Sequence, residues 1–265
     1  MTYVAKPAGE NVNVSKRSAL AEMAWLLGGA LALLLGAYFA LGFAVDHIVE
    51  RMPADWEPVL ARHIDVPLEV DKSDPFQDAV ETLLDDLVDE MDEQPYDYEI
   101  GIAPSNELNA FALPGGRIVV TRALITSVQS ENELAMVLAH ELGHFAHRDH
   151  LRGLGRGLSA AALSILLFGS DSGVTQFLTG TLNVAHAGFS RQQETAADEF
   201  ALELLHAKYG HIGGATDFFE RLAEQETRWG DWLSTHPASS ERVLALRQHA
   251  ARQRYKLGQT LPLRP

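Results

Sequence analysis

Two histidines four residues apart, with a glutamate directly after the first, are the residues of this chain best suited to chemistry. If their segment is helical, His140 and His144 project from one face, where both imidazoles can bind one tetrahedral zinc ion. Glu141 then lies beside the open coordination position and can act as general base for a metal-bound water. The HExxH spacing alone is moderately specific, because a chain with 11 histidines sometimes produces it by chance.

The segment around these histidines has the pattern of an amphipathic helix. Ser130 followed by Glu133 predicts a capping box at its start. Apolar residues then recur at spacings of three and four, namely Leu134, Val137, Leu138, Leu142 and Phe145. Polar groups next to such an apolar stripe are costly to bury without partners, which favours a bound metal.

The third metal ligand has two candidates in the sequence. His150 would complete the pattern HExxHxxGxxH, in which a glycine turns the chain back toward the metal. His147 occupies the glycine position, so we expect the helix to continue and to carry His150 away. His147 and His150 are then expected to be solvated residues at the helix end. Glu194 is the favoured third ligand.

Glu194 lies in a second predicted helix, for which Ser190 and Gln193 form a capping box. Glu194 and Asp198 share one face of this helix. Asp198 is therefore expected to accept the N–H of a ligating imidazole. Small residues, namely Ala196, Ala197 and Ala201, should let this helix approach the first one closely.

A small sheet is expected before the metal helix. Residues 98–103 and 117–121 have strand patterns, and the turn at 114–116 joins the latter to residues 110–113. If the sheet edge is exposed, an extended substrate can add to it as a strand. The residues expected to bind substrate in this way are Asn109, Ala110, Phe111 and Ala112. The alternative is a hairpin with a purely structural role.

Residues 23–45 carry no charge and span about 34 Å as a helix, which is enough to cross a bilayer. A cleaved signal peptide has a shorter apolar region, so we expect an uncleaved signal anchor over residues 19–46. Residues 157–190 are also weakly polar, but two crossings need more residues than this stretch contains. We expect buried or surface-dipping helices there, with a turn at 169–173.

Basic residues precede the anchor, namely Lys6, Lys16 and Arg17, whereas Asp46, Glu50 and Arg51 follow it. This bias places the N-terminus in the cytoplasm and the remaining domain outside it.

The composition excludes several classes of site. The chain has no cysteine, which rules out disulfides and thiolate metal ligands. A net charge of -15 argues against nucleic acid as a partner. The acidic stretch 71–93 carries apolar residues at helical spacing, so its acids are expected to form the solvated face of an amphipathic helix.

Four blocks of sequence together resemble the gluzincin zinc endopeptidases of the HtpX and CaaX-prenyl-protease type, including their periplasmic bacterial relatives. They are residues 109–116, residues 140–144, residues 190–198, and residues 234–237 with Arg242. The resemblance implies one zinc ion per chain bound by His140, His144 and Glu194, with Glu141 as general base and Asp198 orienting a ligand.

The fourth block adds a further histidine to the expected site. In these relatives a histidine of this block lies near the metal, so His236 would stabilise the oxyanion or act as a reversible fourth ligand. The alternative for His236 is a turn residue followed by Pro237. Arg242 is expected to pair with an acid near the site.

These observations predict an α+β fold, mostly helical, with a zinc metallopeptidase domain and one N-terminal transmembrane helix. The expected division is a cytoplasmic tail (1–18), the anchor (19–46), a linker (47–70), the peptidase domain (71–256) and a C-terminal tail (257–265). The resemblance implies cleavage of unfolded or membrane-associated proteins in the cell envelope, at the inner membrane with a periplasmic domain. A single anchor makes prenylated substrates unexpected, and no oligomeric state follows from the sequence. The alternative is a zinc-bound, proteolytically quiet chaperone or assembly factor.

Overall fold

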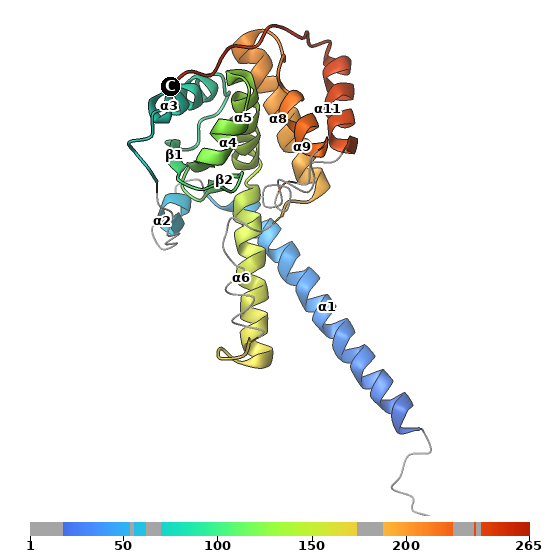
Figure 1. The fold of residues 1–265 in the computed structure, drawn as a ribbon. Coiled ribbons are helices and arrows are strands. Elements are labelled where there is room, and N and C mark those ends of the chain that lie inside the picture. Colours follow the sequence, from blue (N-terminus) through green and yellow to red (C-terminus); the bar gives the residue numbers. More distant parts are fainter. Residues whose placement is uncertain (1–17, 54–55, 62–69, 174–187, 225–235, 237–239) are drawn as a thin grey trace, which may run out of the picture.

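The chain folds into a mostly helical domain with one small sheet, and two long apolar helices project from one side of it (Figure 1). The computed structural model describes residues 18–53, 56–61, 70–173, 188–224, 236 and 240–265. In chain order the elements are α1 (Ala19–Arg51), α2 (Glu57–Ala61), α3 (Gln77–Asp89), β1 (Glu99–Ala103), β2 (Ala110–Leu113), β3 (Arg117–Thr121), α4 (Arg122–Ser127), α5 (Glu131–Ala146), α6 (Asp149–Phe168), α8 (Arg191–Tyr209), α9 (Asp217–Glu224) and α11 (Ser240–Gln253).

The three predicted strands form one small sheet, and their order in it is β1-β3-β2. β3 runs parallel to β1 and antiparallel to β2, with Ala110 opposite Val120. The turn between β2 and β3 needs glycine, because Gly116 has a φ of 81° and a Cβ there would lie 2.8 Å from the carbonyl oxygen of Asp97. In this strand order β2 is an edge strand, and it contacts α5.

α5 is the central helix of the domain, and its residues from Asn132 to Phe145 are all buried. Ser130 caps it by accepting the N–H of Glu133 at 3.2 Å. The predicted capping box is only half formed, because the Glu133 carboxylate accepts from the backbone N–H of Gln129 and from Arg221 instead. The acidic helix α3 packs against this core through apolar residues and turns its acids to solvent, as expected.

α8 lies directly against α5, as its alanines predicted. A Cβ on Gly143 would come within 2.9 Å of the Cα of Ala197, so the two backbones are almost in contact. The expected capping box is present at the start of α8, where Ser190 and Gln193 bond each other's backbone N–H groups. This cap places Glu194 in the first turn of the helix, facing α5.

The chain turns sharply after α5, contrary to the expectation that His147 continues the helix. α5 ends at Ala146, and Arg148 takes a left-handed conformation with φ 55° before α6 begins. His147 is exposed, as expected. His150 is not solvated, since it is buried and its Nε2 lies 2.6 Å from the Glu57 carboxylate. The partner charge of Glu57, far away in sequence, makes this burial tolerable.

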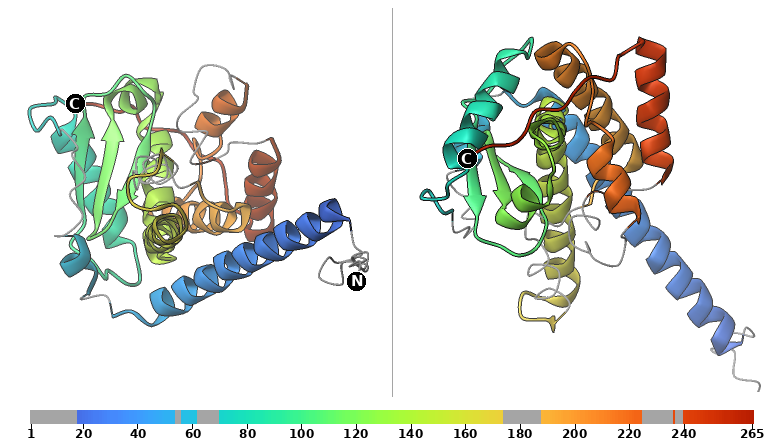
Figure 2. Two further views of the ribbon diagram at one scale, coloured as in Figure 1. Left: turned by 90° about the horizontal axis from the view of Figure 1, so that it is seen from below. Right: turned by 45° about the horizontal axis from the view of Figure 1, so that its top comes forward.

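α1 and α6 are both long and apolar enough to cross a membrane, and they diverge from the same side of the domain (Figures 1 and 2). α1 continues to Arg51, beyond the predicted end at residue 46. α6 ends at Phe168, before the predicted turn. Of the two expectations for this stretch, burial is wrong for the end of α6, and a surface-dipping helix stays a prediction. Exposed large side chains there are Leu158, Ile165, Leu166, Leu167 and Phe168. Residues 174–187 of the stretch lie outside the described residues.

Candidate metal centre

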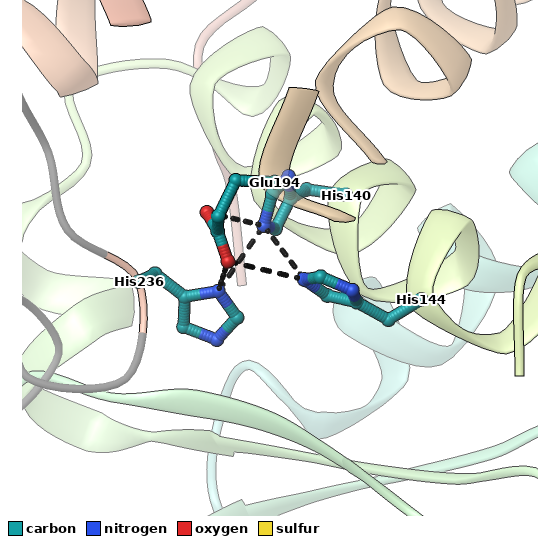
Figure 3. A group of neighbouring side chains, drawn as sticks. All are labelled: His140, His144, Glu194 and His236. Atoms are coloured by element: carbon teal, nitrogen blue, oxygen red, sulfur yellow. Dashed lines mark hydrogen bonds and ion pairs between the residues drawn. The ribbon is translucent and has the colours of Figure 1, made fainter. Parts of the chain in front are cut away.

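Four buried side chains converge between α5 and α8: His140, His144, Glu194 and His236 (Figure 3). α5 contributes the two histidines that are four residues apart, and the first turn of α8 contributes the glutamate. One donor atom from each of the four lies within 4.8 Å of the others. The three predicted ligands and His236 are therefore neighbours, whereas His150 bonds Glu57 instead.

The donor spacing fits a tetrahedral zinc ion. Four donors about 2.0–2.1 Å from zinc lie about 3.3 Å from one another. The Nε2 atoms of His140 and His144 are 3.1 Å apart. The Glu194 carboxylate oxygens lie 3.6 Å from His140 Nε2 and 3.5 Å from His144 Nε2. Two imidazoles and a carboxylate at this spacing are a donor set suited to zinc.

His236 occupies the fourth corner of this group. Its Nδ1 lies 3.2 Å from His140 Nε2 and 3.0 Å from Glu194 Oε1. Its other ring nitrogen lies 3.6 Å from Glu141 Oε1. With an exposed fraction of only 1%, His236 is a member of the cluster and not a solvated turn residue.

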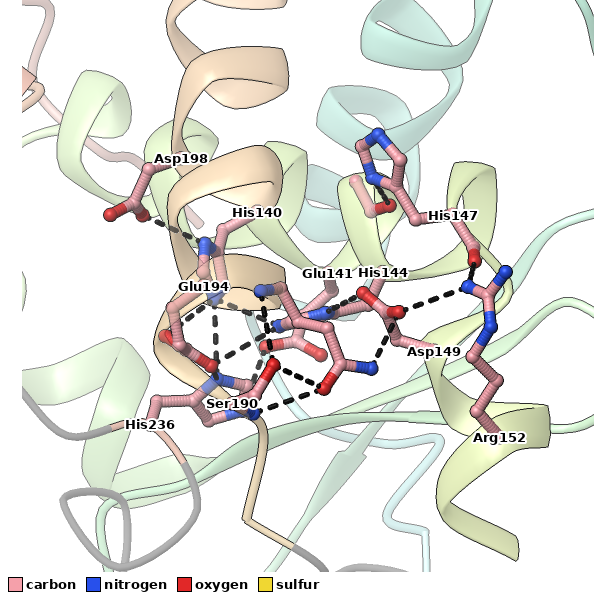
Figure 4. A network of polar contacts seen from close by, with 12 residues as sticks. His140, Glu141, His144, His147, Asp149, Arg152, Ser190, Glu194, Asp198 and His236 are labelled. Atoms are coloured by element: carbon pink, nitrogen blue, oxygen red, sulfur yellow. Dashed lines mark hydrogen bonds and ion pairs between the residues drawn. The ribbon is translucent and has the colours of Figure 1, made fainter. Parts of the chain in front are cut away.

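Two aspartates orient the paired imidazoles (Figure 4). Asp198 lies 3.0 Å from His140 Nδ1, as predicted, and Asp149 lies 3.0 Å from His144 Nδ1. Each Nδ1–H can donate to its carboxylate, which leaves both Nε2 lone pairs directed at the metal position. Asp149 is itself held by the Gln193 side chain, which donates to its other oxygen at 2.7 Å.

Sequence reasoning missed Asp149 and Phe189. Asp149 follows His144 by five residues, a spacing that reaches the imidazole only because the chain turns at Arg148. Phe189 stacks on the ring of His144, with centroids 3.8 Å apart. The one available signal for Phe189 was its place directly before the Ser190 cap, where an apolar residue often packs back onto the protein.

Arg242 binds the acids of the second helix, as expected. Its Nε and Nη2 donate to the two oxygens of Asp198 at 2.6 and 2.7 Å, and its Nη1 lies 2.5 Å from Glu194 Oε2. Burial opposes ionisation of Asp198, but the Arg242 charge outweighs it and holds the pKa of Asp198 below its usual range. Burial likewise opposes ionisation of Glu194, but hydrogen bonds to His144 and His236 and the Arg242 charge outweigh it and hold the pKa of Glu194 below its usual range. Both acids are thus kept in the charged form that a metal site needs.

The imidazoles of His140 and His144 differ in their affinity for protons. Burial and the Arg242 charge lower the pKa of His140. Burial also disfavours the charged form of His144, but hydrogen bonds to Asp149 and Glu194 outweigh it and raise the pKa of His144 to about 9. In the metal-free protein, His144 therefore carries a proton at neutral pH, and a metal ion has to displace it.

Glu141 is fully buried, and neither of its carboxylate oxygens has a hydrogen-bond partner among the described residues. A buried carboxylate without a donor is costly, so a group that donates to it is expected in this space. A metal-bound water is such a donor. This orphaned carboxylate beside the tetrahedral donors is the second observation that fits a hydrolytic metal centre.

The residues predicted to bind substrate lie on and beside β2. Ala110, Phe111 and Ala112 are in the strand. Just before it, the backbone N–H of Asn109 donates to the Thr121 hydroxyl, which donates to the Asn109 carbonyl. β3 pairs with one edge of β2, and no other strand of the described ranges pairs with the opposite edge. A strand of the sheet passes beneath His236 and His144 (Figure 3). The role of these residues in substrate binding stays a prediction.

Comparison with known proteins places this site in a family. The profile of peptidase family M48 matches residues 76–250. Metalloprotease LoiP of Escherichia coli is 30% identical over 172 residues, which cover 63% of this chain and 67% of LoiP. Mitochondrial metalloendopeptidase OMA1 of Arabidopsis thaliana is 32% identical over 154 residues, 57% of this chain and 31% of OMA1. Beta-barrel assembly-enhancing protease of E. coli is 30% identical over 164 residues, 57% of this chain and 34% of that protein.

The chain thus spans two thirds of LoiP but about a third of the other two relatives. The matched region contains both site helices and the sheet. The family expected from the four sequence blocks is confirmed. The chain belongs to peptidase family M48 and carries the zinc metallopeptidase domain of that family.

Proposed function

We propose that this chain is a membrane-anchored zinc metalloendopeptidase that cleaves unfolded or membrane-associated proteins in the cell envelope. The observation that carries the proposal is the buried carboxylate of Glu141, which accepts no hydrogen bond from the described residues, beside three donors at tetrahedral spacing. The printed name of the beta-barrel assembly-enhancing protease of E. coli supports a role in the envelope, and the printed name of LoiP supports a metalloprotease.

In this proposal His140, His144 and Glu194 hold the metal, while Asp149 and Asp198 fix the two imidazole rings. Zinc, when bound, supplies a Lewis acid that lowers the pKa of water to about 7 and polarises the scissile carbonyl. Glu141 takes the proton of the attacking water and passes it to the leaving amine, which otherwise departs poorly. Arg242 keeps Glu194 and Asp198 ionised without touching the reacting atoms.

The edge of β2 is the proposed binding position for substrate. A peptide in extended conformation would pair its backbone with residues 109–112 and place a peptide bond near the metal. Binding through the backbone gives little sequence preference, which suits the degradation of unfolded chains. This geometry requires the second edge of β2, with which no strand of the described ranges pairs.

For the anchor, we propose that α1 crosses the inner membrane with the N-terminus in the cytoplasm and the peptidase domain in the periplasm. Its length and hydropathy support a crossing, and the basic residues before it support this orientation. The division of the chain into tail, anchor, linker, peptidase domain and C-terminal tail is part of the same proposal.

One observation favours a second candidate function. His236 Nδ1 lies at the fourth corner of the donor group, where an attacking water has to bind. If His236 stays there as a ligand, the chain is a zinc-bound, proteolytically quiet chaperone or assembly factor. If it moves away, or binds the oxyanion instead, the site is a working peptidase.

The test is cleavage of casein by the full-length chain in detergent micelles, with zinc content and thermal unfolding measured on each variant. Glu141→Gln keeps the shape of the side chain but removes its basicity, and it is expected to lower the rate by at least about 100-fold. His236→Ala separates the two roles of His236, because the rate falls if it stabilises the oxyanion and rises if it blocks the site. Wild type, Glu141→Gln and His236→Ala that are all folded, zinc-loaded and equally inert would contradict the peptidase proposal.

A further inference from the structure

We infer that the exposed end of α6 enters the lipid bilayer beside α1 without crossing it. This inference rests on the proposed membrane anchor. The end of α6 carries large apolar side chains, of which Leu166 is 81% exposed, on the side of the domain from which α1 also projects (Figure 1). Such an apolar surface is unfavourable in water and favourable in lipid, which surrounds α1 in the proposed anchor.

A salt bridge sets the uncharged parts of the two helices at one level. Arg156 Nη2 lies 2.9 Å from each oxygen of Asp46. Asp46 directly follows the uncharged stretch 23–45 of α1, and Arg156 directly precedes the uncharged stretch 157–168 of α6. Both apolar stretches therefore begin at the same charged pair and run away from the domain, as expected for two helices that enter one membrane surface.

The same region fixes α6 to α1. A Cβ on Gly155 would lie 2.6 Å from Val45 Cγ1, so the helices touch next to the salt bridge. Arg148 donates to the backbone carbonyl of Val49 at 3.0 Å, one turn closer to the domain. These contacts hold the start of α6 against α1. The end of α6 therefore projects from the same side of the domain as α1.

Beyond the salt bridge the helices diverge around a cleft of about 390 Å³. α1 contributes Tyr38, Phe39 and Phe43 to its walls, and α6 contributes Ser159 and Leu163. An apolar wedge that opens with distance from the domain accommodates lipid acyl chains. The turn after α6 contains Asp171, the only charged residue between 157 and 190, and a charge at this place argues for partial entry rather than a crossing.

The inference sets the height of the metal centre above the membrane. α6 begins at Asp149, which orients the proposed ligand His144. Seven residues later the helix reaches Arg156, whose salt bridge with α1 marks the membrane surface in this inference. Seven residues of helix rise about 10 Å, which is an upper limit for the height if α6 is tilted. An extended peptide covers this distance in about three residues. The preferred substrates are therefore membrane proteins, cut in the segment directly outside the bilayer.

The chain has no cysteine, so single cysteines can carry a fluorescent label at chosen positions in the full-length protein. We choose Leu166→Cys as the test, Leu33→Cys on α1 as the membrane control and Glu203→Cys on the exposed side of α8 as the aqueous control. Each labelled chain is placed in phosphatidylcholine vesicles with either a lipid-borne nitroxide or aqueous iodide as quencher. We expect the label at position 166 to be quenched by the nitroxide lipid and protected from iodide, as at position 33.

Three results would overturn the inference. A label at position 166 that iodide quenches as strongly as at position 203, with position 33 still in lipid, removes α6 from the membrane and leaves the anchor intact. Iodide quenching at position 33 refutes the anchor, and the inference falls with it. A label at position 166 that is shielded from both quenchers, together with disulfide-linked pairs of unlabelled Leu166→Cys chains under an added oxidant, assigns the surface to a second copy of the chain.

Discussion

Replacing Asp149 with asparagine removes the negative charge that faces the Nδ1–H of His144. The carboxylate oxygen and this nitrogen are 3.0 Å apart, and both groups are buried. Asparagine has nearly the same shape, and its side-chain oxygen can still accept a hydrogen bond. The substitution therefore tests the charge of Asp149 with little change in volume.

The expected loss of zinc affinity follows from the position of Asp149 behind a ligand. Removal of a carboxylate that orients a ligating imidazole typically costs about 10–100-fold in metal affinity, or about 1.4–2.7 kcal/mol. We expect the upper part of this range, because Asp149 is almost fully buried and Gln193 already holds it in place.

The loss is expected to depend on pH, because protons compete with zinc for His144. Burial disfavours the charged imidazole, but Asp149 and Glu194 raise the pKa of His144 to about 9, so at pH 7 the proton weakens zinc binding by about 100-fold. Without Asp149 the pKa of His144 falls and this competition weakens. The ratio of wild-type to Asp149→Asn affinity should therefore be larger at pH 9 than at pH 7.

Competition with a chromophoric chelator measures zinc affinity directly and does not depend on catalysis. Asp78→Asn serves as the matched control, since Asp78 lies on the exposed face of α3, and its affinity should equal that of wild type at both pH values. An affinity ratio for Asp149→Asn that stays near one at pH 9, or that shrinks between pH 7 and pH 9, would refute the proposed role of Asp149.

Three further predictions concern helix contact, a buried ion pair and the metal. Gly143→Ala should lower both the thermal midpoint and zinc affinity, by about 1–3 kcal/mol in stability, because its Cβ meets the backbone of Ala197; an unchanged midpoint in calorimetry contradicts this close approach. Burial opposes ionisation of Glu57, but hydrogen bonds from His150 and Tyr96 outweigh it and keep the pKa of Glu57 below 4.5 in the folded protein. The ionised Glu57 carboxylate therefore stabilises the folded state above pH 4.5, and this stabilisation is lost as pH falls through the lower folded pKa. Glu57→Gln should therefore destabilise the chain at pH 7, and the gap to wild type in thermal midpoint should narrow below pH 4.5; a gap that widens there argues against the pair. Chelation of zinc should lower the thermal midpoint, and free zinc at 100 times its Kd should restore about 2.7 kcal/mol, whereas a midpoint independent of zinc would contradict a metal bound to the folded state.

The sequence predicted those parts of the site that local periodicity determines. A spacing of four residues on a helix brings His140 and His144 to one face, and the same spacing brings Glu194 and Asp198 together. The Ser190 cap fixed the start of the second helix to the residue. The strands were predictable as well, because their apolar runs end at glycine and proline turns.

The missed contacts depend on a turn that sequence patterns did not reveal. Arg148 adopts a left-handed conformation, which is uncommon for a residue with a side chain, so the expectation of a continuous helix was reasonable but wrong. This single turn changes the positions of Asp149 and His150. It brings Asp149 to His144, and it buries His150 against Glu57.

The pairing of His150 with Glu57 also shows why the segment after α1 is more than a linker. Glu57 accepts hydrogen bonds from His150, Tyr96 and the backbone of Gly115, so one buried carboxylate ties α2 to the sheet and to the start of α6. None of these partners lies within 30 residues of Glu57, and no local pattern signals them. Because α6 also carries Asp149 at its start and contacts α1 along its first turns, the segment that follows α1 is bonded to the same turn that orients the proposed ligand His144. A change in the attachment of α1 to the domain is therefore expected to act on zinc affinity through Asp149.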